Sequence, residues 1–340
     1  MQDKNIIDPV SGFQYPDSWV KSDISHEEIT SLRKGLTLLT ADGTILRRGY
    51  TTGTTTAAAA KAAVLSLRNA ISGEVTILTP VGIRVPVPVS GDRGHGVCYK
   101  YSGDYPGDVT AGIAIHVDAK ITHKEIVIKT GLGVGIWERE NPRYKKGTPA
   151  ISPPAYQEIY TAVEEALQDI KGSGAEICIW VEDGEKVASL TLNTRIGVER
   201  GISILGSTGF VEPWDDHLEE SLIERVLQSQ KLVLTTGRIG LRYARILFPG
   251  YEVILVGSKI GPALLHAQGE VIICGLPALI LKFMDPDFLD GSGYGSIEEM
   301  LGTDRFSELA MKTINDFSHR HPGVRVVLLE RSGGILLESS

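Results

Sequence analysis

The last third of the chain alternates short apolar runs with segments long enough for helices, and this rhythm constrains the fold more than any other feature. Four runs bounded by glycine have strand character: residues 231–235, 252–256, 270–274 and 324–330. The segments between them predict helices over residues 218–227, 240–247 and 297–317. Strands separated by helices are typical of a parallel sheet with helices on its faces. We therefore expect a mostly parallel, Rossmann-like α/β layer in this part.

The middle of the chain has a different rhythm, because its strand-like runs follow one another after short gaps. Strands are predicted over residues 75–79, 83–89, 97–101, 113–121, 125–130, 176–181 and 187–192, and helices over residues 57–63 and 156–170. Short gaps imply hairpins, so this part should be a largely antiparallel α+β domain. Pro86 and Pro88 should confine their strand to an edge of the sheet. Asp183 and Gly184 should turn the last two strands.

The length and composition are those of a globular protein with two domains. The chain has 340 residues, of which 42% are hydrophobic and 22% charged. We expect an N-terminal arm at residues 1–40 with a short helix over 25–36, an α+β domain at 41–205, and an α/β domain at 206–340. Glycine and threonine are concentrated in loops of the middle domain.

Charge and cysteine content exclude several classes of protein. The formal net charge is −8, and no basic stripe of a nucleic-acid binder is present. Cys98, Cys178 and Cys274 are too far apart for a zinc site or a disulfide framework, so no protein-bound metal is expected. No run has the length of a signal peptide or a membrane helix. We therefore expect a cytoplasmic protein that acts without a membrane or nucleic-acid partner.

The first segment that could carry chemistry covers residues 47–63, where five threonines and Gly53 fill positions 51–56 before an alanine-rich helix. Free backbone N–H groups, hydroxyls and the positive end of a helix would suit an anion or a carboxylate. An ordinary capped helix, packed closely through its small alanines, explains the same residues equally well.

A second segment, residues 101–110, places Asp104 and Asp108 in a turn-rich loop. The two carboxylates could act as a base or orient a polar ligand. Hydrogen bonds to their own turn are the favoured alternative on spacing alone.

The third segment, residues 129–154, has alternating glycines followed by a basic stretch that includes Arg143, Lys145 and Lys146. It does not match the dinucleotide fingerprint, which needs a parallel βαβ unit around it. A basic lid over an anionic ligand and a solvated loop are both compatible with it.

The fourth segment, residues 193–214, takes a strand over 202–205 into Gly206, Ser207, Thr208 and Gly209 near the domain junction, where ligand clefts tend to form. Later, Thr236 and Gly237 end a predicted parallel strand, and open sheets bind ligands at such ends. No P-loop lysine follows either glycine-rich turn, so hydrolysis of nucleoside triphosphates is not supported. A phosphate-transferring kinase is disfavoured for the same reason.

Together these segments resemble the CbiD family, the cobalt-precorrin-5B C1-methyltransferases of anaerobic cobalamin biosynthesis. The resemblance covers roughly residues 6–240 and rests on LRRGYTTGTTTAAAAKAA, GDVT, KTGLGVG, GTPAISPP and GISILGSTGFVEP in one order. It implies methyl transfer from S-adenosylmethionine to carbon 1 of cobalt-precorrin-5B, giving cobalt-precorrin-6A, with the cobalt belonging to the substrate. It also implies an α+β domain resembling the second domain of ribosomal protein S5.

The site residues that we carry forward fall into three groups. Asp104 and Asp108 are the catalytic candidates. Contacts with the methyl donor are expected at Gly206, Ser207, Thr208, Gly209, Thr236 and Gly237. Contacts with the substrate and its acetate and propionate groups are expected at Arg47, Arg48, Thr51, Thr52, Thr54, Arg143, Lys145 and Lys146. The alternative for Arg47 and Arg48 is an ion pair with the protein's own carboxylates.

The chain departs from the family pattern at two places. Many members have Cys where Thr55 stands, so no cysteine nucleophile is needed here. The last third lacks the family's G-H-I-G-K and T-H-S runs. This departure motivates an alternative function, a corrinoid- or tetrapyrrole-binding protein without catalysis. Transient contact with neighbouring pathway enzymes is a further expectation.

Overall fold

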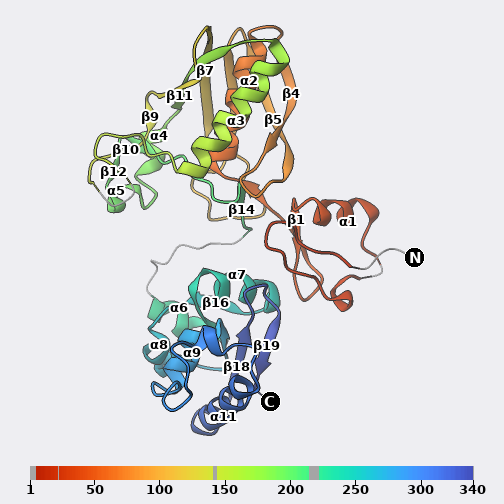
Figure 1. Cartoon of the computed structure of the whole chain (residues 1–340), viewed down its shortest axis with the longest axis vertical. Coiled ribbons are helices and arrows are strands. Elements are labelled where there is room, and N and C mark those ends of the chain that lie inside the picture. The colour runs from red at the N-terminus through yellow and green to blue at the C-terminus, as the bar shows by residue number, and fades with distance from the viewer. Residues whose placement is uncertain (1–4, 22, 141–143, 214–221, 340) are drawn as a thin grey trace. The chain divides into compact units, whose positions relative to one another are not determined.

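The computed structural model describes residues 5–21, 23–140, 144–213 and 222–339. The chain divides into two compact units (Figure 1). One comprises Met1–Arg33, Leu39–Ile45 and Asp216–Ser340, and the other Lys34–Leu38 and Leu46–Asp215. We call them the parallel unit and the antiparallel unit after their sheets. The expected limits of 1–40, 41–205 and 206–340 stay a prediction.

The antiparallel unit is built on a six-stranded sheet. In spatial order its strands are β4 (Ile71–Leu78), β5 (Arg84–Asp92), β6 (His95–Tyr99), β7 (Ala114–Thr122), β11 (Gly174–Val181) and β8 (Val127–Thr130). All neighbours pair antiparallel except β11 and β8, which are parallel. Buried and exposed residues alternate strictly along β5, so one face of this strand meets the core and the other meets solvent.

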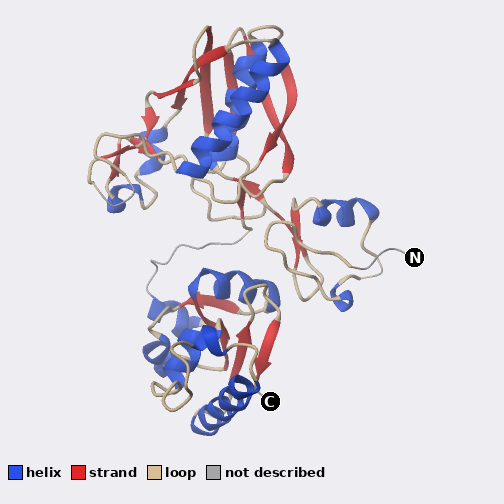
Figure 2. Ribbon diagram, viewed as in Figure 1, coloured by secondary structure: helices blue, strands red, loops and turns tan. Residues whose placement is uncertain are grey.

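Two helices, α2 (Thr52–Ser66) and α3 (Pro153–Ile170), pack against each other on one face of the sheet (Figures 1 and 2). Nearly all of α2 is buried, because its alanines let it lie directly on the strands. Ala155, Ile159, Ala162 and Ala166 form the buried stripe of α3, at the spacing of one helix face.

Short elements complete this unit. Three pairs of two-residue strands are present: β3 (Gly49–Tyr50) with β14 (Phe210–Val211), β9 (Gly133–Val134) with β13 (Gly201–Ile202), and β10 (Ile136–Trp137) with β12 (Val198–Glu199). Two short helices, α4 (Gly184–Ala188) and α5 (Asn193–Ile196), follow β11.

The parallel unit contains a five-stranded sheet with helices between its strands. Its order is β16 (Glu252–Leu255), β15 (Lys231–Thr236), β17 (Glu270–Gly275), β18 (Val324–Leu329) and β19 (Ile335–Glu338). The first four are parallel and β19 is antiparallel to β18. The helices are α6 (Leu222–Gln228), α7 (Gly237–Leu247), α8 (Ile260–His266), α9 (Pro277–Met284), α10 (Ile297–Met300) and α11 (Asp304–Arg320).

The N-terminal elements are short. They comprise the 3-10 helix η1 (Asp17–Trp19), the helix α1 (His26–Arg33), and the two-stranded sheet of β1 (Thr37–Leu39) and β2 (Ile45–Arg47). In the described part of the chain, no helix is both long and apolar enough to cross a membrane.

The predicted fold class, with antiparallel and parallel sheets in one chain, is confirmed. Several local predictions are wrong. The segment 297–317 contains two helices, α10 and α11, instead of one, and the strand expected over 202–205 is the two-residue β13. The run 187–192 forms no strand, since it comprises the end of α4 and the turn that leads into α5. The strand with Pro86 and Pro88 lies between two others and not at an edge. It can hold both prolines because β6 pairs with it only at Ser90–Asp92, beyond them. The resemblance to ribosomal protein S5 stays a prediction.

Candidate functional site

The segment before α2 is held in backbone contact with the turn that follows β6. A β-carbon on Gly49 would lie 2.4 Å from the carbonyl carbon of Ser102, so a larger residue does not fit. The Arg47 amide donates to Asp104 Oδ2 at 2.8 Å, and Arg47 Nε donates to Asp104 Oδ1 at 3.2 Å. The Arg47 side chain is nevertheless 68% exposed. Asp104 therefore ties two distant segments together, which differs from the hydrogen bonds to its own turn that spacing alone favoured. Its catalytic role stays a prediction.

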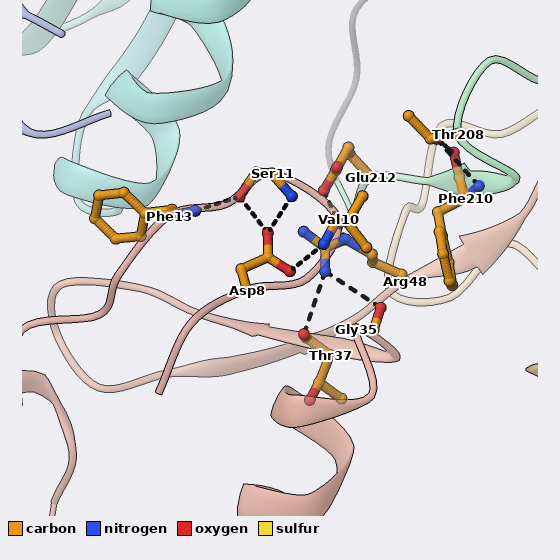
Figure 3. Close-up of polar contacts among 10 residues, drawn as sticks. All are labelled: Asp8, Val10, Ser11, Phe13, Gly35, Thr37, Arg48, Thr208, Phe210 and Glu212. Carbon is orange, nitrogen blue, oxygen red and sulfur yellow. Dashed lines mark hydrogen bonds and ion pairs between the residues drawn. The ribbon is translucent and has the colours of Figure 1, made fainter. Parts of the chain in front are cut away.

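Arg48 lies in a very different environment from Arg47, and Figure 3 shows its polar contacts with Glu212, Gly35 and Thr37. Its side chain is fully buried, and Nε donates to Glu212 Oε2 at 3.1 Å. Nη1 lies within donating distance of the carbonyl oxygens of Gly35, at 3.2 Å, and Thr37, at 3.4 Å. This is the ion pair with the protein's own carboxylates that we kept as the alternative. Contact of Arg48 with the substrate stays a prediction.

The start of α2 is bound by the loop around residue 205. The Thr51 amide donates to Gly209 O at 3.0 Å, and the Gly53 amide donates to Leu205 O at 2.8 Å. The Leu205 amide donates to the Thr52 hydroxyl at 2.8 Å, and Thr51 Oγ1 caps the Thr54 amide. These are the contacts of a capped, closely packed helix, and they occupy the N–H groups that an anion would use. Substrate contacts of Thr51, Thr52 and Thr54 stay a prediction.

The glycines of the 206–209 loop allow it to approach α2 closely. A β-carbon on Gly206 would lie 2.6 Å from Thr51 Oγ1. Gly209 has a φ of +88°, and its β-carbon would lie 2.7 Å from that of Thr79. Thr208 caps the short turn into β14 through the Phe210 amide, and Ser207 is exposed. Close contacts with protein atoms thus explain why positions 206 and 209 are glycine. Contact of the four residues with the methyl donor stays a prediction.

A buried carboxyl group, Glu158 of α3, faces the same helix start. Glu158 is 3% exposed, and burial raises its pKa to about 7 although the Thr54 hydroxyl opposes this. Thr54 Oγ1 lies 2.8 Å from both Glu158 Oε1 and Gly209 O. A hydroxyl has one hydrogen to donate, so a protonated Glu158 that donates to Thr54 satisfies both contacts. Among the described residues, Glu158 Oε2 has no hydrogen-bond partner.

This environment predicts a pH-dependent stability that Glu158→Gln removes. The pKa of Glu158 is above its ordinary value of 4.5, so the folded state binds the proton more tightly than the unfolded state. The contribution is therefore fully present below pH 4.5 and is lost as the pH rises towards 7. Over this range the free energy of unfolding of the native protein should fall by up to about 3 kcal/mol relative to that of Glu158→Gln. Urea denaturation at several pH values measures this difference. The same dependence of the unfolding free energy on pH in both proteins would contradict the prediction.

The second aspartate of the turn, Asp108, forms a buried ion pair with Lys100. The two side chains are 9% and 3% exposed, and Thr110 donates to the same carboxylate through its amide at 3.0 Å. Burial disfavours the charged form of Asp108, but Lys100 and Thr110 together hold its pKa below the ordinary value. Asp108 is therefore a carboxylate fixed in place by a cation, and its catalytic role stays a prediction.

The predicted basic lid contributes three described cations, Arg139, Lys145 and Lys146. Lys145 and Lys146 are both exposed, and Lys146 Nζ lies 3.8 Å from Glu138 Oε2. Next to them, Tyr144 stacks on Trp137 with ring centroids 4.6 Å apart. Arg143 lies outside the described residues. Exposed ammonium groups fit a basic lid and a solvated loop equally well, so contact of Arg143, Lys145 and Lys146 with the substrate stays a prediction.

In the parallel unit, Thr236 and Gly237 lie at the carboxyl end of β15. From β15 the chain continues to β16 on one side of the sheet, and from β17 it continues to β18 on the other side. Ligands of open α/β sheets bind where two neighbouring connections diverge in this way. Gly237 has a φ of +68°, and a β-carbon there would meet no atom within 4 Å. Arg238 and Lys259 are exposed at the ends of β15 and β16, and residues 256–259 include no carboxylate. The space beside Gly237 is open, and the exposed Arg238 and Lys259 favour an anion over a cation.

The sequence did not indicate Lys100, Glu158 and Glu212 as partners of the candidate residues. For Glu158 a signal existed, because it occupies the apolar stripe of α3 between Ala155 and Ile159. A carboxyl group in such a stripe needs a partner or a raised pKa. In the described ranges, no group of three or more His, Cys, Asp or Glu residues could hold a metal ion.

Comparisons with known proteins agree with the motifs. The family model described as CbiD matches residues 39–213. Cobalt-precorrin-5B C(1)-methyltransferase of Methanospirillum hungatei is 50% identical over 332 residues, which cover 98% of this chain and 99% of that protein. The protein of the same name from Methanoregula boonei is also 50% identical with the same coverage.

A solved structure agrees as well. The crystal structure of a cobalamin biosynthesis protein (cbiD) from Archaeoglobus fulgidus is 36% identical, with a TM-score of 0.57, and covers 95% of this chain and 100% of its own. The family model matches more than half of the chain, and the relatives align over nearly its whole length. These findings confirm the resemblance: the chain belongs to the CbiD family.

Proposed function

We propose that this chain is a cobalt-precorrin-5B C1-methyltransferase of anaerobic cobalamin biosynthesis, which methylates ring carbon 1 and gives cobalt-precorrin-6A. The observation that carries the proposal is the 50% identity to a relative of this name over 98% of the chain. S-adenosylmethionine is the proposed donor, and it supplies a methyl group on a positively charged sulfur that a nucleophilic ring carbon can accept. No covalent intermediate with the protein is required.

Within this proposal, the exposed cations hold the substrate. Arg47, Lys145 and Lys146 present charged groups to solvent, where they can meet the acetate and propionate groups of the corrinoid. The buried Arg48 has a supporting role, because it binds Glu212 and the 35–37 segment beside β3. The net charge of −8 repels a polyanion, so these local cations have to outweigh it.

The decisive experiment is methyl transfer by the purified chain. We expect the corrinoid to gain the mass of one CH₂ group when the protein is incubated with cobalt-precorrin-5B and S-adenosylmethionine. S-adenosylhomocysteine in place of the donor is the control and should give no gain. Tight corrinoid binding without any mass gain would contradict the proposal and favour the non-catalytic corrinoid-binding alternative.

A further inference from the structure

A cavity of about 540 Å³ lies in the antiparallel unit, on a part of the molecule to which no role has been assigned above. It forms where β5 and β6 part: the two strands pair only at Ser90–Asp92, and the preceding residues of β5 line the cavity. Gly73 and Glu74 of β4 line it as well. Its volume lies within the range of about 300–1,000 Å³ that small-molecule sites have.

Three tyrosines are the main feature of its wall. Tyr50 belongs to the family-specific segment before α2, Tyr99 is the last residue of β6, and Tyr101 lies two residues beyond it. The rings of Tyr50 and Tyr101 have centroids 6.2 Å apart and are inclined by 57°, so they form a corner. Tyr99 is 67% exposed and Tyr101 is 44% exposed, which is unusual for side chains of this size.

Tyr50 remains a neutral phenol under ordinary conditions. It is 8% exposed, and its hydroxyl donates to Pro86 O at 2.9 Å. Burial raises the pKa of Tyr50 to about 12. The polar end of the ring is thus bound to the protein, and the phenol supplies no reactive oxygen to the wall.

The charge of the cavity indicates which ligand it accepts. Among the described residues that line it there is no Lys, Arg or His, and Glu74 adds a carboxylate. The faces of tyrosine rings carry negative electrostatic potential and attract cations. An anion such as a polycarboxylate corrinoid is therefore disfavoured here, whereas a cation that carries an aromatic group fits.

We propose that this cavity binds the methyl donor through its sulfonium group, with the adenine ring against the exposed tyrosines. The inference rests on the proposed function, which supplies S-adenosylmethionine as the donor. A sulfonium has three carbon substituents and no N–H or O–H group, so it cannot form hydrogen bonds from its charged centre. Aromatic faces and a carboxylate are the protein groups that stabilise such a cation.

The two places predicted from the sequence fit this ligand less well. In the 206–209 loop, the side chains of Thr51 and Thr79 occupy the space beside Gly206 and Gly209. At the edge of the parallel sheet, the exposed Arg238 follows Gly237 directly and adds positive charge there. Both places remain the alternatives that the experiment has to distinguish from the cavity.

Calorimetry on the full chain tests the assignment. Tyr99→Ala and Glu74→Gln should each weaken binding of S-adenosylmethionine, by about tenfold for the tyrosine. Binding of S-adenosylhomocysteine, which lacks the positive charge, should change less in Glu74→Gln. Tyr156→Ala and Glu164→Gln remove an exposed tyrosine and an exposed carboxylate of α3 outside the cavity, and should leave both affinities unchanged. Unchanged donor affinity in folded Tyr99→Ala and Glu74→Gln would overturn the assignment.

Photochemical labelling of the native chain gives a second readout that needs no variant. Ultraviolet crosslinking of radiolabelled S-adenosylmethionine should label the tryptic peptides 94–100 and 101–120, which contain Tyr99 and Tyr101. Label in peptide 201–225 or 232–238 would instead place the donor at the glycine-rich loops and overturn the assignment. Methyl transfer by the native chain, measured separately, keeps the proposed function intact in that case. Failure of the native chain to bind the donor would contradict both.

Discussion

Replacing Gly96 with alanine should destabilise the antiparallel unit by about 3 kcal/mol or more, because a β-carbon there has no space. It would lie 2.2 Å from the carbonyl oxygen of Ala59 and 2.6 Å from the amide nitrogen of Ala63. Both atoms belong to the backbone of α2, so no flexible side chain can move aside. On the neighbouring strand, a β-carbon on Gly91 would lie 2.8 Å from Ala62 O. The helix therefore rests directly on two glycines of the sheet.

Chemical denaturation of Gly96→Ala measures the loss, and Gly250→Ala is its matched control. A β-carbon on Gly250 would meet no atom within 4 Å, so this second substitution should change stability by less than about 0.5 kcal/mol. Since a domain is stable by about 5–15 kcal/mol, the Gly96 variant should also lose activity at temperatures that the native protein tolerates. A loss of stability in Gly96→Ala as small as that in Gly250→Ala would contradict the prediction and show that α2 can shift away from β6.

The sequence indicated only half of this contact. Its alanine-rich run predicted a helix, and close packing through small side chains was one of the alternatives. The glycines opposite, Gly91 and Gly96, lie 29 and 37 residues beyond their partners Ala62 and Ala59, in a hairpin whose register the helix pattern does not reveal. A close approach of two backbones depends on both partners, so one of them alone does not predict it.

Strands and helices with a clear period were predicted well. The four parallel strands follow from apolar runs between glycines, and α3 follows from its single apolar stripe. The run 187–192 failed because Val187, Leu190 and Leu192 give an apolar pattern that also fits a strand. In the structure Gly184 starts α4 instead, after Asp183 in a left-handed conformation with a φ of 53°. Local alternation does not distinguish a short helix from a strand.

The candidate residues were found from the sequence, but their environments were not. Arg47 and Arg48 are adjacent and chemically identical, yet one is mostly exposed and the other fully buried. The partner of Arg48 is 164 residues away, and Glu158 is 104 residues from Thr54. Exposure and pairing of this kind arise from contacts between distant segments, which no spacing rule encodes.

The contrast within the arginine pair leads to the second large effect: Arg48→Ala should cost about 3–5 kcal/mol of stability. The substitution leaves the partly buried Glu212 carboxylate without its guanidinium partner and removes the donor facing the carbonyl oxygens of Gly35 and Thr37. Arg48→Lys should recover only part of the loss, because an ammonium group cannot reproduce the planar fork. Thermal and urea denaturation measure both variants.

Arg47→Ala is the matched control, because it removes the same side chain one position earlier. Its ion pair with Asp104 is exposed, and such pairs contribute about 0–1 kcal/mol, so stability should hardly change. Corrinoid affinity should fall in Arg47→Ala if this cation meets a substrate carboxylate, whereas Arg48→Ala should affect affinity only through folding. A folded Arg48→Ala protein with native stability and weakened corrinoid binding would reverse these roles. It would place the buried arginine, rather than the exposed one, in contact with the substrate.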